Sequence, residues 1–286
     1  MKKTIGFIAD TAADIPKDLQ EKYDIKIIPL RVIFGDVTYN PCVDITNQEF
    51  YELIKTDPNH PTTSQSTPED VENAYNEMLE KYDSIIHVTI GSEASGTFSV
   101  VSLVAQEFIE KGKDITVIDS HNLCVGIGVP VMNAAKMRDE GKSKEEIIEY
   151  IKTATTRDMP YFLVDDLNHL KKGGRIKASS VAIANLLDIK PILWVNQGLT
   201  QVMDKVRGSK KSVARLVDIM LEKGDNIKEQ DVYVIHSLGG EKLDLCIKLI
   251  EEKIAPKSIN VFELGPTIVT HCGLGVVCVY FIQKEA

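Results

Sequence analysis

The sequence lacks long hydrophobic runs and an excess of positive charge. Its longest nearly apolar stretch, from Val276 to Ile282, is far too short to span a bilayer. The apolar run after Lys2 and Lys3 stops at Asp10, so we expect no signal peptide. Lysine and arginine number 33 against 42 aspartate and glutamate residues, for a net charge of -9. This balance disfavours a broad nucleic-acid-binding surface, so we expect no nucleic-acid partner and no stable membrane insertion.

Cysteine pairs with metal-ligand or redox spacing are also missing. The five cysteines are odd in number and scattered, and none forms a C-x-x-C motif; they are Cys42, Cys124, Cys246, Cys272 and Cys278. We therefore expect reduced thiols in a cytoplasmic protein, with neither a disulfide framework nor a zinc site.

The motifs of common cofactor and hydrolase chemistry are absent as well. Residues 91–98 have the glycine spacing of a phosphate-binding loop, but Thr97 stands where that loop needs lysine. The sequence has no complete G-x-G-x-x-G, no G-x-S-x-G around Ser95 and no H-E-x-x-H. We therefore predict no cofactor, no metal and no catalytic residue.

What is present is an ordinary globular composition, with 43% hydrophobic and 26% charged residues. In the first half, short apolar runs alternate with amphipathic stretches. We expect strands at Thr4–Ala9, Ser84–Ile90, Ile115–Asp119 and Tyr161–Val164, two strand pieces within Ile25–Phe34, and helices at Pro16–Lys22, Gln48–Lys55, Glu69–Lys81, Phe98–Lys111, Gly126–Glu140 and Ser143–Thr155. This alternation predicts a parallel sheet covered on both faces.

The pattern changes between residues 165 and 177, where a basic, glycine-rich segment indicates a linker or an exposed turn. Beyond it we expect helices at Ser179–Leu187, Ser209–Lys223 and Glu241–Ile254, a hairpin of Ile192–Val195 with Leu199–Met203, and strands at Val232–His236, Ile259–Leu264 and Val276–Ile282. The predicted fold class is thus α/β, with a parallel-sheet α/β domain at 1–165 and a smaller α+β domain at 166–286.

Two turns rich in polar side chains come early in the chain. Residues 10–14 follow the first strand, at the sheet edge where α/β proteins bind ligands, although Asp14 could instead cap the next helix. Residues 62–68 carry five hydroxyls in six positions, and Thr67 fits a helix N-cap. The other hydroxyls, Thr63 among them, have no evident structural reason beyond a solvated loop.

Two further turns have ligand-binding character. Residues 91–97 lie between a strand and a helix, and such a turn favours a small anion such as a carboxylate, held by backbone N–H groups and by Ser95 or Thr97. The alternative is that Ser95 is a plain helix cap. Residues 265–273 place His271 beside Thr270 and two glycines, where the histidine is either structural or part of a site.

Taken together, these segments resemble the DegV family, whose members are fatty-acid-binding proteins and acyl carriers for a bacterial fatty acid kinase. The resemblance covers residues 3–284. It rests on Ala9–Ile15, Thr63-Ser64-Gln65-Ser66, Ser95-Gly96-Thr97, Val164–Leu167, Leu170–Ile176, Lys190–Leu193, Gly265-Pro266 and His271 before Gly273-Leu274-Gly275. The chain departs from the usual family pattern at Ala12, Ser66 and Leu274, where serine, proline and proline are common.

The resemblance implies a two-domain DegV-like fold and a long-chain fatty acid, such as palmitate, as the bound ligand. Carried over by motif, Thr63 and Ser95 would bind the carboxylate, with His271 beside them, and Ser64, Gly96, Thr97 and Thr270 are possible further contacts. Arg175 would lie near the pocket mouth and contact the kinase. For the lipid tail we expect an apolar pocket, with Phe34, Ile90, Phe98, Leu123, Val125 and Ile192 as candidates because they lie beside these turns.

Three classes of function stay open at this point. The favoured one is a lipid-binding carrier with no catalysis of its own. The second is a hydrolase or acyltransferase that uses Ser95 with His271 as its base, although no carboxylate is evident to orient that histidine. The third is a regulatory protein in which the lipid is structural. Mass spectrometry separates the first two, since an ester-linked adduct on Ser95 would indicate an enzyme.

Overall fold

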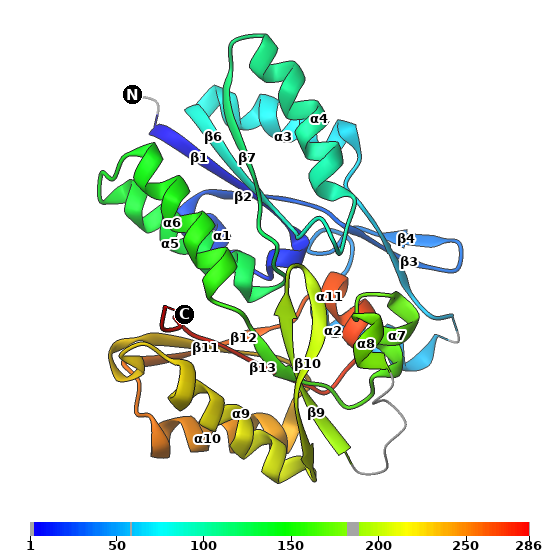
Figure 1. Ribbon diagram of the computed structural model, residues 1–286. Helices are drawn as coiled ribbons and strands as arrows, with labels where there is room; N and C mark the ends of the chain where they lie inside the picture. Colours follow the sequence, from blue (N-terminus) through cyan, green and yellow to red (C-terminus); the bar gives the residue numbers. More distant parts are fainter. Residues whose placement is uncertain (1–2, 58, 182–188, 286) are drawn as a thin grey trace.

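A parallel four-stranded sheet forms the upper half of the molecule as drawn in Figure 1, in a computed structural model that describes residues 3–57, 59–181 and 189–285. Its strand order is β2-β1-β6-β7. The bounds are β1 (Lys3–Asp10), β2 (Ile25–Ile28), β6 (Tyr82–Thr89) and β7 (Asp114–Asp119). Because all four strands run the same way, the loops after β1, β6 and β7 meet at one edge of the sheet.

Helices cover both faces of this sheet. On one face lie α3 (Pro68–Lys81) and α4 (Thr97–Glu110); on the other lie α1 (Lys17–Tyr23) and α5 (Val125–Asp139), with α6 (Lys144–Arg157) packed on α5. Local sequence fixes where several of them begin. Thr67 and Asp70 form a reciprocal capping box at the start of α3, and Ser143 and Glu146 form another before α6. The predicted helices over these segments are confirmed within two residues at each end.

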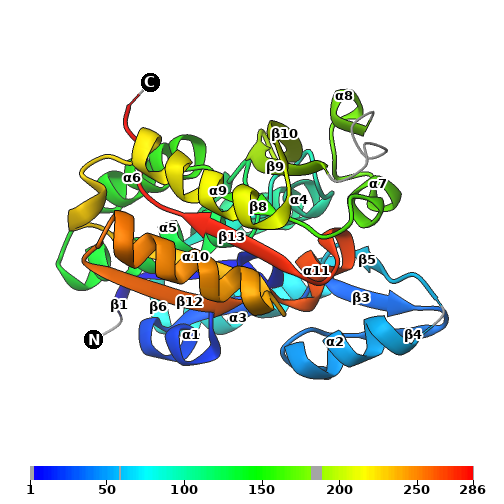
Figure 2. The same ribbon diagram turned by 90° about the horizontal axis from the view of Figure 1, so that it is seen from below.

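A mixed six-stranded sheet forms the lower half, in the order β10-β9-β8-β13-β11-β12. Its strands are β8 (Tyr161–Leu163), β9 (Ile189–Asn196), β10 (Leu199–Arg207), β11 (Asp231–Ser237), β12 (Ser258–Glu263) and β13 (Val276–Tyr280). Helices α9 (Ser209–Lys223) and α10 (Gly240–Lys253) cover its outer face, as the view from below in Figure 2 shows. The α/β fold class, with a parallel-sheet half and a smaller α+β half, is thus confirmed.

Side chains alternate between the two faces of this lower sheet. Along β13, Val276 and Cys278 belong to the central core, whereas Val277 and Val279 pack with α9 and α10. The upper sheet alternates in the same way, since Phe7 of β1 faces the central core. The inner faces of both sheets therefore share one apolar middle layer.

A small antiparallel sheet, β4-β3-β5, lies beside this middle layer. The remaining elements of the described residues are β3 (Arg31–Phe34), β4 (Val37–Tyr39), β5 (Thr62–Ser64), α2 (Asn47–Thr56), α7 (Asn168–Gly173), α8 (Ala178–Val181), α11 (Pro266–Cys272) and the short 3-10 helices η1 (Thr11–Ala13) and η2 (Ile227–Glu229). Helix α11 contacts β3 and β5, so the C-terminal half and the small sheet meet directly.

Three sequence-based expectations need correction. Residues 62–64 form a strand instead of a turn, because they pair with β3. Residues 168–173 are helical instead of a linker. The strand at Tyr161–Leu163 joins the lower sheet, between β13 and β9, instead of closing the upper parallel sheet. Of the helix expected at Ser179–Leu187, residues 182–187 lie outside the described residues. The division into domains at residue 165 stays a prediction.

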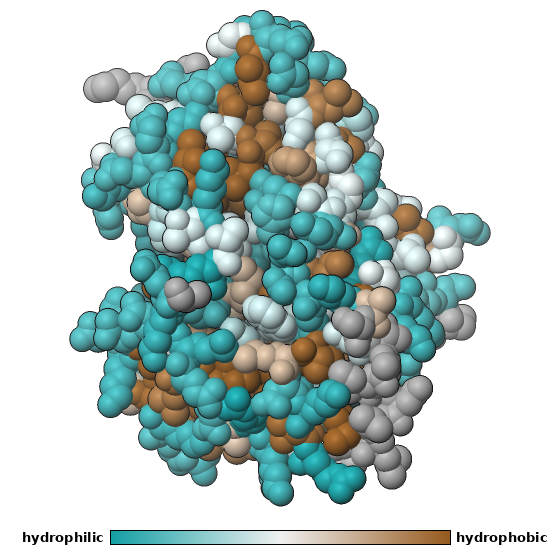
Figure 3. All heavy atoms as spheres, in the orientation of Figure 1, coloured by the Kyte–Doolittle hydropathy of each residue, from teal (hydrophilic) through white to brown (hydrophobic). Residues whose placement is uncertain are grey.

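The surface is mostly hydrophilic on the face drawn in Figure 3, with hydrophobic residues gathered over β7 and beside α4. Leu103 and Ile109 of α4 are among the exposed hydrophobic side chains. Within the described ranges, none of the helices has the length and the apolar character that crossing a bilayer requires.

Candidate functional site

A cavity of about 380 Å³ lies in the middle layer, within the size range of small-molecule sites. Residues from the upper half, the lower half and the small sheet all line it. They are Leu30, Thr63, Ser64, Gln65, Ile90, Ala94, Ser95, Gly96, Leu123, Cys124, Pro160, Phe162, Leu170, Arg175, Val195, Thr200, Leu264, Thr267, Ile268, His271, Cys272, Val276 and Cys278. The wall is therefore predominantly apolar, with a few polar groups.

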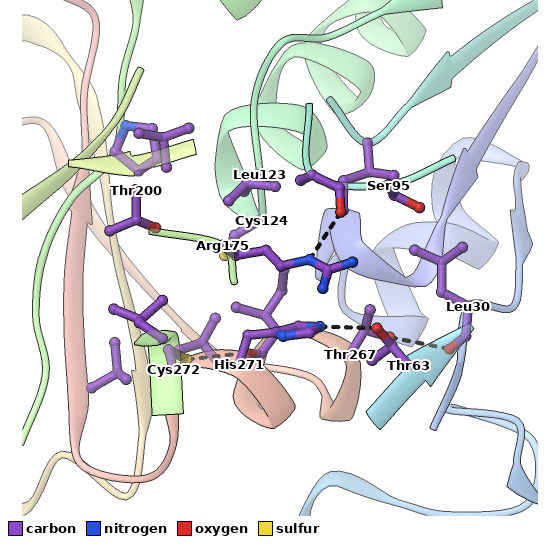
Figure 4. A pocket seen from close by; sticks show the side chains of 18 of the residues that line it. Leu30, Thr63, Ser95, Leu123, Cys124, Arg175, Thr200, Thr267, His271 and Cys272 are labelled. Carbon is purple, nitrogen blue, oxygen red and sulfur yellow. Dashed lines mark hydrogen bonds between the residues drawn. The ribbon is translucent and has the colours of Figure 1, made fainter. Parts of the chain in front are cut away.

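Four of the polar groups lie together, and we call Thr63, Ser95, Arg175 and His271 the polar cluster (Figure 4). Two hydrogen bonds help to fix their side chains. Thr63 Oγ1 is 2.9 Å from His271 Nε2, and Arg175 donates from Nε to the carbonyl oxygen of Ala94, next to Ser95. In Figure 4 the guanidinium group of Arg175 lies between Ser95 and the imidazole ring. Residues far apart in sequence thus converge on one part of the cavity.

Thr63 reaches the cavity because it stands in the middle of β5. This strand pairs antiparallel with β3, with Thr63 opposite Val32. Its neighbour Thr62 is exposed, as the alternation of side chains along a strand requires. The pairing with β3 therefore places Thr63 in the cavity wall and Thr62 in solvent.

His271 contributes a neutral ring to the polar cluster. Burial, reinforced by the positive charge of Arg175 and by His60, lowers the pKa of His271 to about 4. Its Nδ1 atom is buried without a hydrogen-bond partner among the described residues. A Cβ atom at Gly173 would overlap this nitrogen, so glycine is required there for the ring to sit as it does.

Ser95 is held by the turn that begins helix α4. Its Oγ lies 2.8 Å from the hydroxyl of Thr97 and accepts a hydrogen bond from the Thr97 N–H at 3.3 Å. Thr97 is fully buried and does not line the cavity. A Cβ atom at Gly96 would overlap Gln65 Oε1, so this turn and the segment after β5 approach each other closely. The alternative that Ser95 is a plain helix cap is wrong, because the N-cap of α4 is Gly96 with no side-chain cap, and Ser95 stands in the cavity wall.

Arg175 lines the cavity itself. Its guanidinium group also donates from Nη1 to the carbonyl oxygen of Gly173 at 2.6 Å. Within the described part of the chain it forms no ion pair with an acidic side chain. Since guanidinium has five N–H donors and two are used here, donors and a full positive charge remain for an anion. With His271 neutral, the polar cluster is cationic.

The turn at residues 10–14 lies outside the cavity wall and holds the two halves together. Asp10 accepts hydrogen bonds from the N–H groups of Ala12 and Ile90, and Asp14 accepts one from the N–H of Gly265 at the start of α11. The expectation that Asp14 caps the next helix is wrong, because that helix begins at Lys17 with no side-chain cap.

Two of the six predicted tail residues line the cavity, and four do not. Ile90 and Leu123 line the cavity, whereas Phe34, Phe98, Val125 and Ile192 do not. Ile192 packs toward α9 and α10, on the outer face of the lower sheet, while Val195 of the same strand reaches the cavity. Strand alternation could have identified Val195, but the sequence alone does not show which face is inner.

Of the further contacts proposed from the sequence, Ser64 and Gly96 line the cavity and Thr97 and Thr270 do not. Thr270 instead donates its hydroxyl to the carbonyl oxygen of Pro266. Sequence reasoning missed several lining residues on α11 and β13; these include Thr267, Cys272, Val276 and Cys278.

The geometry does not support a serine–histidine catalytic pair. The ring of His271 is bonded to Thr63, and the hydroxyl of Ser95 is bonded to Thr97. No hydrogen bond joins Ser95 to His271 among the described residues, nor does a carboxylate orient the ring. The arrangement can bind an anion with an apolar tail.

Comparison with known proteins places these features in one family. The family model that matches residues 4–284 is described as an uncharacterised protein of the DegV family. A DegV domain-containing protein from Caldanaerobacter subterraneus is 32% identical over 280 residues, which cover 98% of this chain and 99% of that protein. Protein DegV of Bacillus subtilis is 31% identical over 281 residues, with 98% and 99% covered.

Solved structures show the same similarity. A DegV family protein from Thermus thermophilus, described for its fatty acid binding, superposes with a TM-score of 0.89 at 28% identity, covering 99% of this chain and 100% of that one. The DegV protein of Bacillus subtilis, described as a fatty acid binding protein, gives a TM-score of 0.87 at 30% identity with the same coverage.

Proposed function

The chain belongs to the DegV family, and we propose that it binds a long-chain fatty acid, such as palmitate, in the cavity between its two larger sheets. The carboxylate would lie at the polar cluster and the hydrocarbon tail along the apolar wall. The observation that carries the proposal is the cationic polar cluster within an otherwise apolar cavity.

The polar cluster suits a carboxylate better than a neutral head group. Thr63 and Ser95 offer hydroxyl donors, and Arg175 offers charge-assisted N–H donors. A carboxylate buried without such partners would cost several kcal/mol, so these groups make the burial of the head group possible. Neutral His271 can orient Thr63 without adding a second charge.

The tail supplies the affinity in this proposal. A sixteen-carbon acid carries about fifteen carbon groups, each worth ~0.8 kcal/mol on burial, or roughly 12 kcal/mol before costs. Association costs on the order of 4–15 kcal/mol, so only part of that gain remains as affinity. The apolar wall includes Ile90, Leu123, Phe162, Val195 and Val276.

We further propose that the protein presents the bound carboxylate to a fatty acid kinase and has no catalysis of its own. Lys171, Lys172 and Lys177 are exposed and flank Arg175 in sequence. A cationic surface beside the carboxylate would steer a partner that carries ATP and acidic metal ligands. The proposal includes a cytoplasmic location, where the five free cysteines would stay reduced.

The test begins with the lipid content of the purified protein. Native extraction followed by mass spectrometry should recover a non-covalent long-chain fatty acid at about one per chain. The delipidated protein is then titrated with palmitate. The double variant Thr63→Ala/Ser95→Ala should bind palmitate at least tenfold more weakly than the unaltered protein.

A matched control comes from neighbouring hydroxyls that face solvent. Thr62 on β5 and Ser99 on α4 are exposed, so Thr62→Ala/Ser99→Ala should bind palmitate as the unaltered protein does. Equal affinity in both double variants would refute the carboxylate site. An ester-linked adduct on Ser95 would refute the non-catalytic carrier.

A further inference from the structure

Three side chains with metal-binding groups lie together on the loops that follow β6 and β7. They are Glu93, Asp119 and His121, and one ligand atom from each lies within 4.8 Å of the others. His121 Nδ1 is 3.2 Å from Glu93 Oε1 and 3.6 Å from Asp119 Oδ2. None of the three lines the fatty-acid cavity.

The carboxylate of Asp119 is already oriented for such a role. Its Oδ1 accepts hydrogen bonds from the N–H groups of Ser92 and His121, both at 3.1 Å. This leaves Oδ2 directed toward the imidazole ring. Backbone donors that fix the outer oxygen of a carboxylate are the usual support of a metal ligand.

The separations of His121 Nδ1 from the two carboxylates suit a tetrahedral ion. Two ligand atoms, each about 2.1 Å from zinc, lie about 3.4 Å apart in a tetrahedral site. The separations of 3.2 Å and 3.6 Å from His121 Nδ1 fall on either side of this value. One imidazole nitrogen and two carboxylate oxygens are a donor set that suits zinc, whereas magnesium and calcium prefer oxygen alone.

The cluster is also accessible. Asp119 and His121 line a surface hollow of about 500 Å³, which Glu149 and Lys152 of α6 line as well. Lys152 brings one positive charge to this hollow, against the negative charges of Asp119, Glu149 and Glu93 nearby. An ion therefore has an open approach, and an open coordination position would face the hollow.

We propose that Glu93, Asp119 and His121 form a binding site for one zinc ion. The ion would join the loop of residues 90–96 to the loop of residues 120–124. These loops already touch, since the N–H of Gly91 donates to the carbonyl oxygen of Asn122. Each also supplies wall residues to the cavity, Ser95 from the first and Leu123 from the second. Bound zinc would thus hold two parts of the cavity wall in register.

The test uses the full-length protein with Cys42→Ser, because Cys42 is an exposed thiol that could bind zinc by itself. Calorimetric titration with zinc chloride should show one ion per chain. Glu93→Gln, Asp119→Asn and His121→Asn should each weaken binding at least tenfold. Cobalt(II) should give the visible absorption of a tetrahedral complex, lost in the same three variants.

A control and a second readout make the outcome decisive. His60 is exposed and lies outside the cluster, so His60→Asn should leave zinc binding unchanged. Zinc should slow amide hydrogen exchange at Ser92 and His121, whose N–H groups donate to Asp119. The zinc site would be overturned if zinc binding did not saturate, or if His60→Asn and His121→Asn lost zinc affinity equally. Either result would leave the fatty-acid proposal untouched.

Discussion

Thr63 on β5 and His271 on α11 are 208 residues apart in sequence, and Thr63 Oγ1 lies 2.9 Å from His271 Nε2. The contact joins the small sheet of the N-terminal half to a helix of the C-terminal half. Because burial keeps the ring neutral, its hydrogen bond to Thr63 involves no ion pair. Under the proposed function, ligand binding at Thr63 would therefore be coupled to the way the two halves pack.

The position of Arg175 in the cavity wall predicts a head-group preference. Arg175→Gln removes the positive charge, so affinity for palmitate should fall on the order of tenfold to a hundredfold. Affinity for the fatty alcohol of equal length should change little, because the alcohol has no charge to neutralise. Paired displacement titrations measure both, and equal losses for acid and alcohol would contradict a charge-specific role.

We expect Thr97 to affect palmitate binding by holding the hydroxyl of Ser95 in place. Thr97→Val keeps the buried shape but removes the hydroxyl bonded to Ser95, so palmitate binding should weaken about threefold to tenfold. Thr97→Ser keeps a hydroxyl and should restore most of the affinity. Titration of both variants checks this. A Thr97→Val protein that binds normally would show that Ser95 needs no such support.

Substitution of the two glycines before Arg175 should have different effects. We expect Gly173 to affect palmitate binding and Gly174 to affect folding stability. A Cβ atom at Gly173 would overlap His271 Nδ1, so Gly173→Ala should displace the ring and weaken palmitate binding about tenfold. Gly174 has a φ of 68° with open space around it, so Gly174→Ala should cost about 1 kcal/mol of folding stability and leave binding intact. Thermal unfolding and titration of both proteins separate these effects, and reversed results would contradict the assignment.

Substitutions on the two faces of β9 should have different effects. We expect those on the cavity face to change the preferred chain length of the ligand and those on the outer face to change folding stability. Val195→Phe adds volume on the cavity side, so affinity for palmitate should fall more than affinity for a twelve-carbon acid. Ile192→Phe adds the same kind of volume against α9 and α10, and should lower stability by about 1–3 kcal/mol without altering chain-length preference. An unchanged chain-length ratio in Val195→Phe would place the tail elsewhere.

Asp14 should impose a pH dependence on folding. Burial raises its pKa from 3.8 to about 7, opposed by hydrogen bonds from Cys124 and Gly265. Between these two pH values the folded protein binds more protons than the unfolded chain, so this contribution to the free energy of unfolding falls as pH rises. Asp14→Asn removes the titration and should lose less stability between pH 5 and pH 8.

Urea unfolding at both pH values measures the Asp14 effect as a difference from the unaltered protein. Taking this difference removes the contribution of His271, which is present in both proteins. Because the pKa of His271 is about 4 in the folded state, its contribution to the free energy of unfolding rises with pH up to about 6.5. Asp18→Asn removes an exposed carboxylate on α1 and should follow the unaltered protein. Parallel pH profiles for all three proteins would contradict the assignment to Asp14.

The sequence predicts the elements of this fold well, because apolar periodicity and helix caps are local. Such signals predict the hairpin around Asn196-Gln197-Gly198 and the helix at Ser209–Lys223, and both are confirmed. The strand at residues 62–64 was missed because only its pairing with β3 makes it a strand. Likewise, the sequence placed Tyr161–Leu163 in the upper sheet because strand order depends on contacts between distant residues.

The site was predictable only in part, for a similar reason. Hydroxyl-rich segments and the family resemblance pointed to Thr63, Ser95 and His271, and the structure brings their side chains to one cavity. The predicted tail residues lie near those segments in sequence, but nearness in sequence does not determine which way a side chain points. Ile192 and Val195 differ only in the face of β9 they occupy.

The alternation along β9 and β13 also has an evolutionary consequence. On each strand, alternate residues face the central core that holds the cavity, and those between them pack against α9 and α10. Under the proposed function, substitutions on the inner face would change which ligand is selected while the outer face preserves the folded state. The two sets can therefore diverge under separate selection, and lineages can acquire new ligand preferences without first losing a stable scaffold.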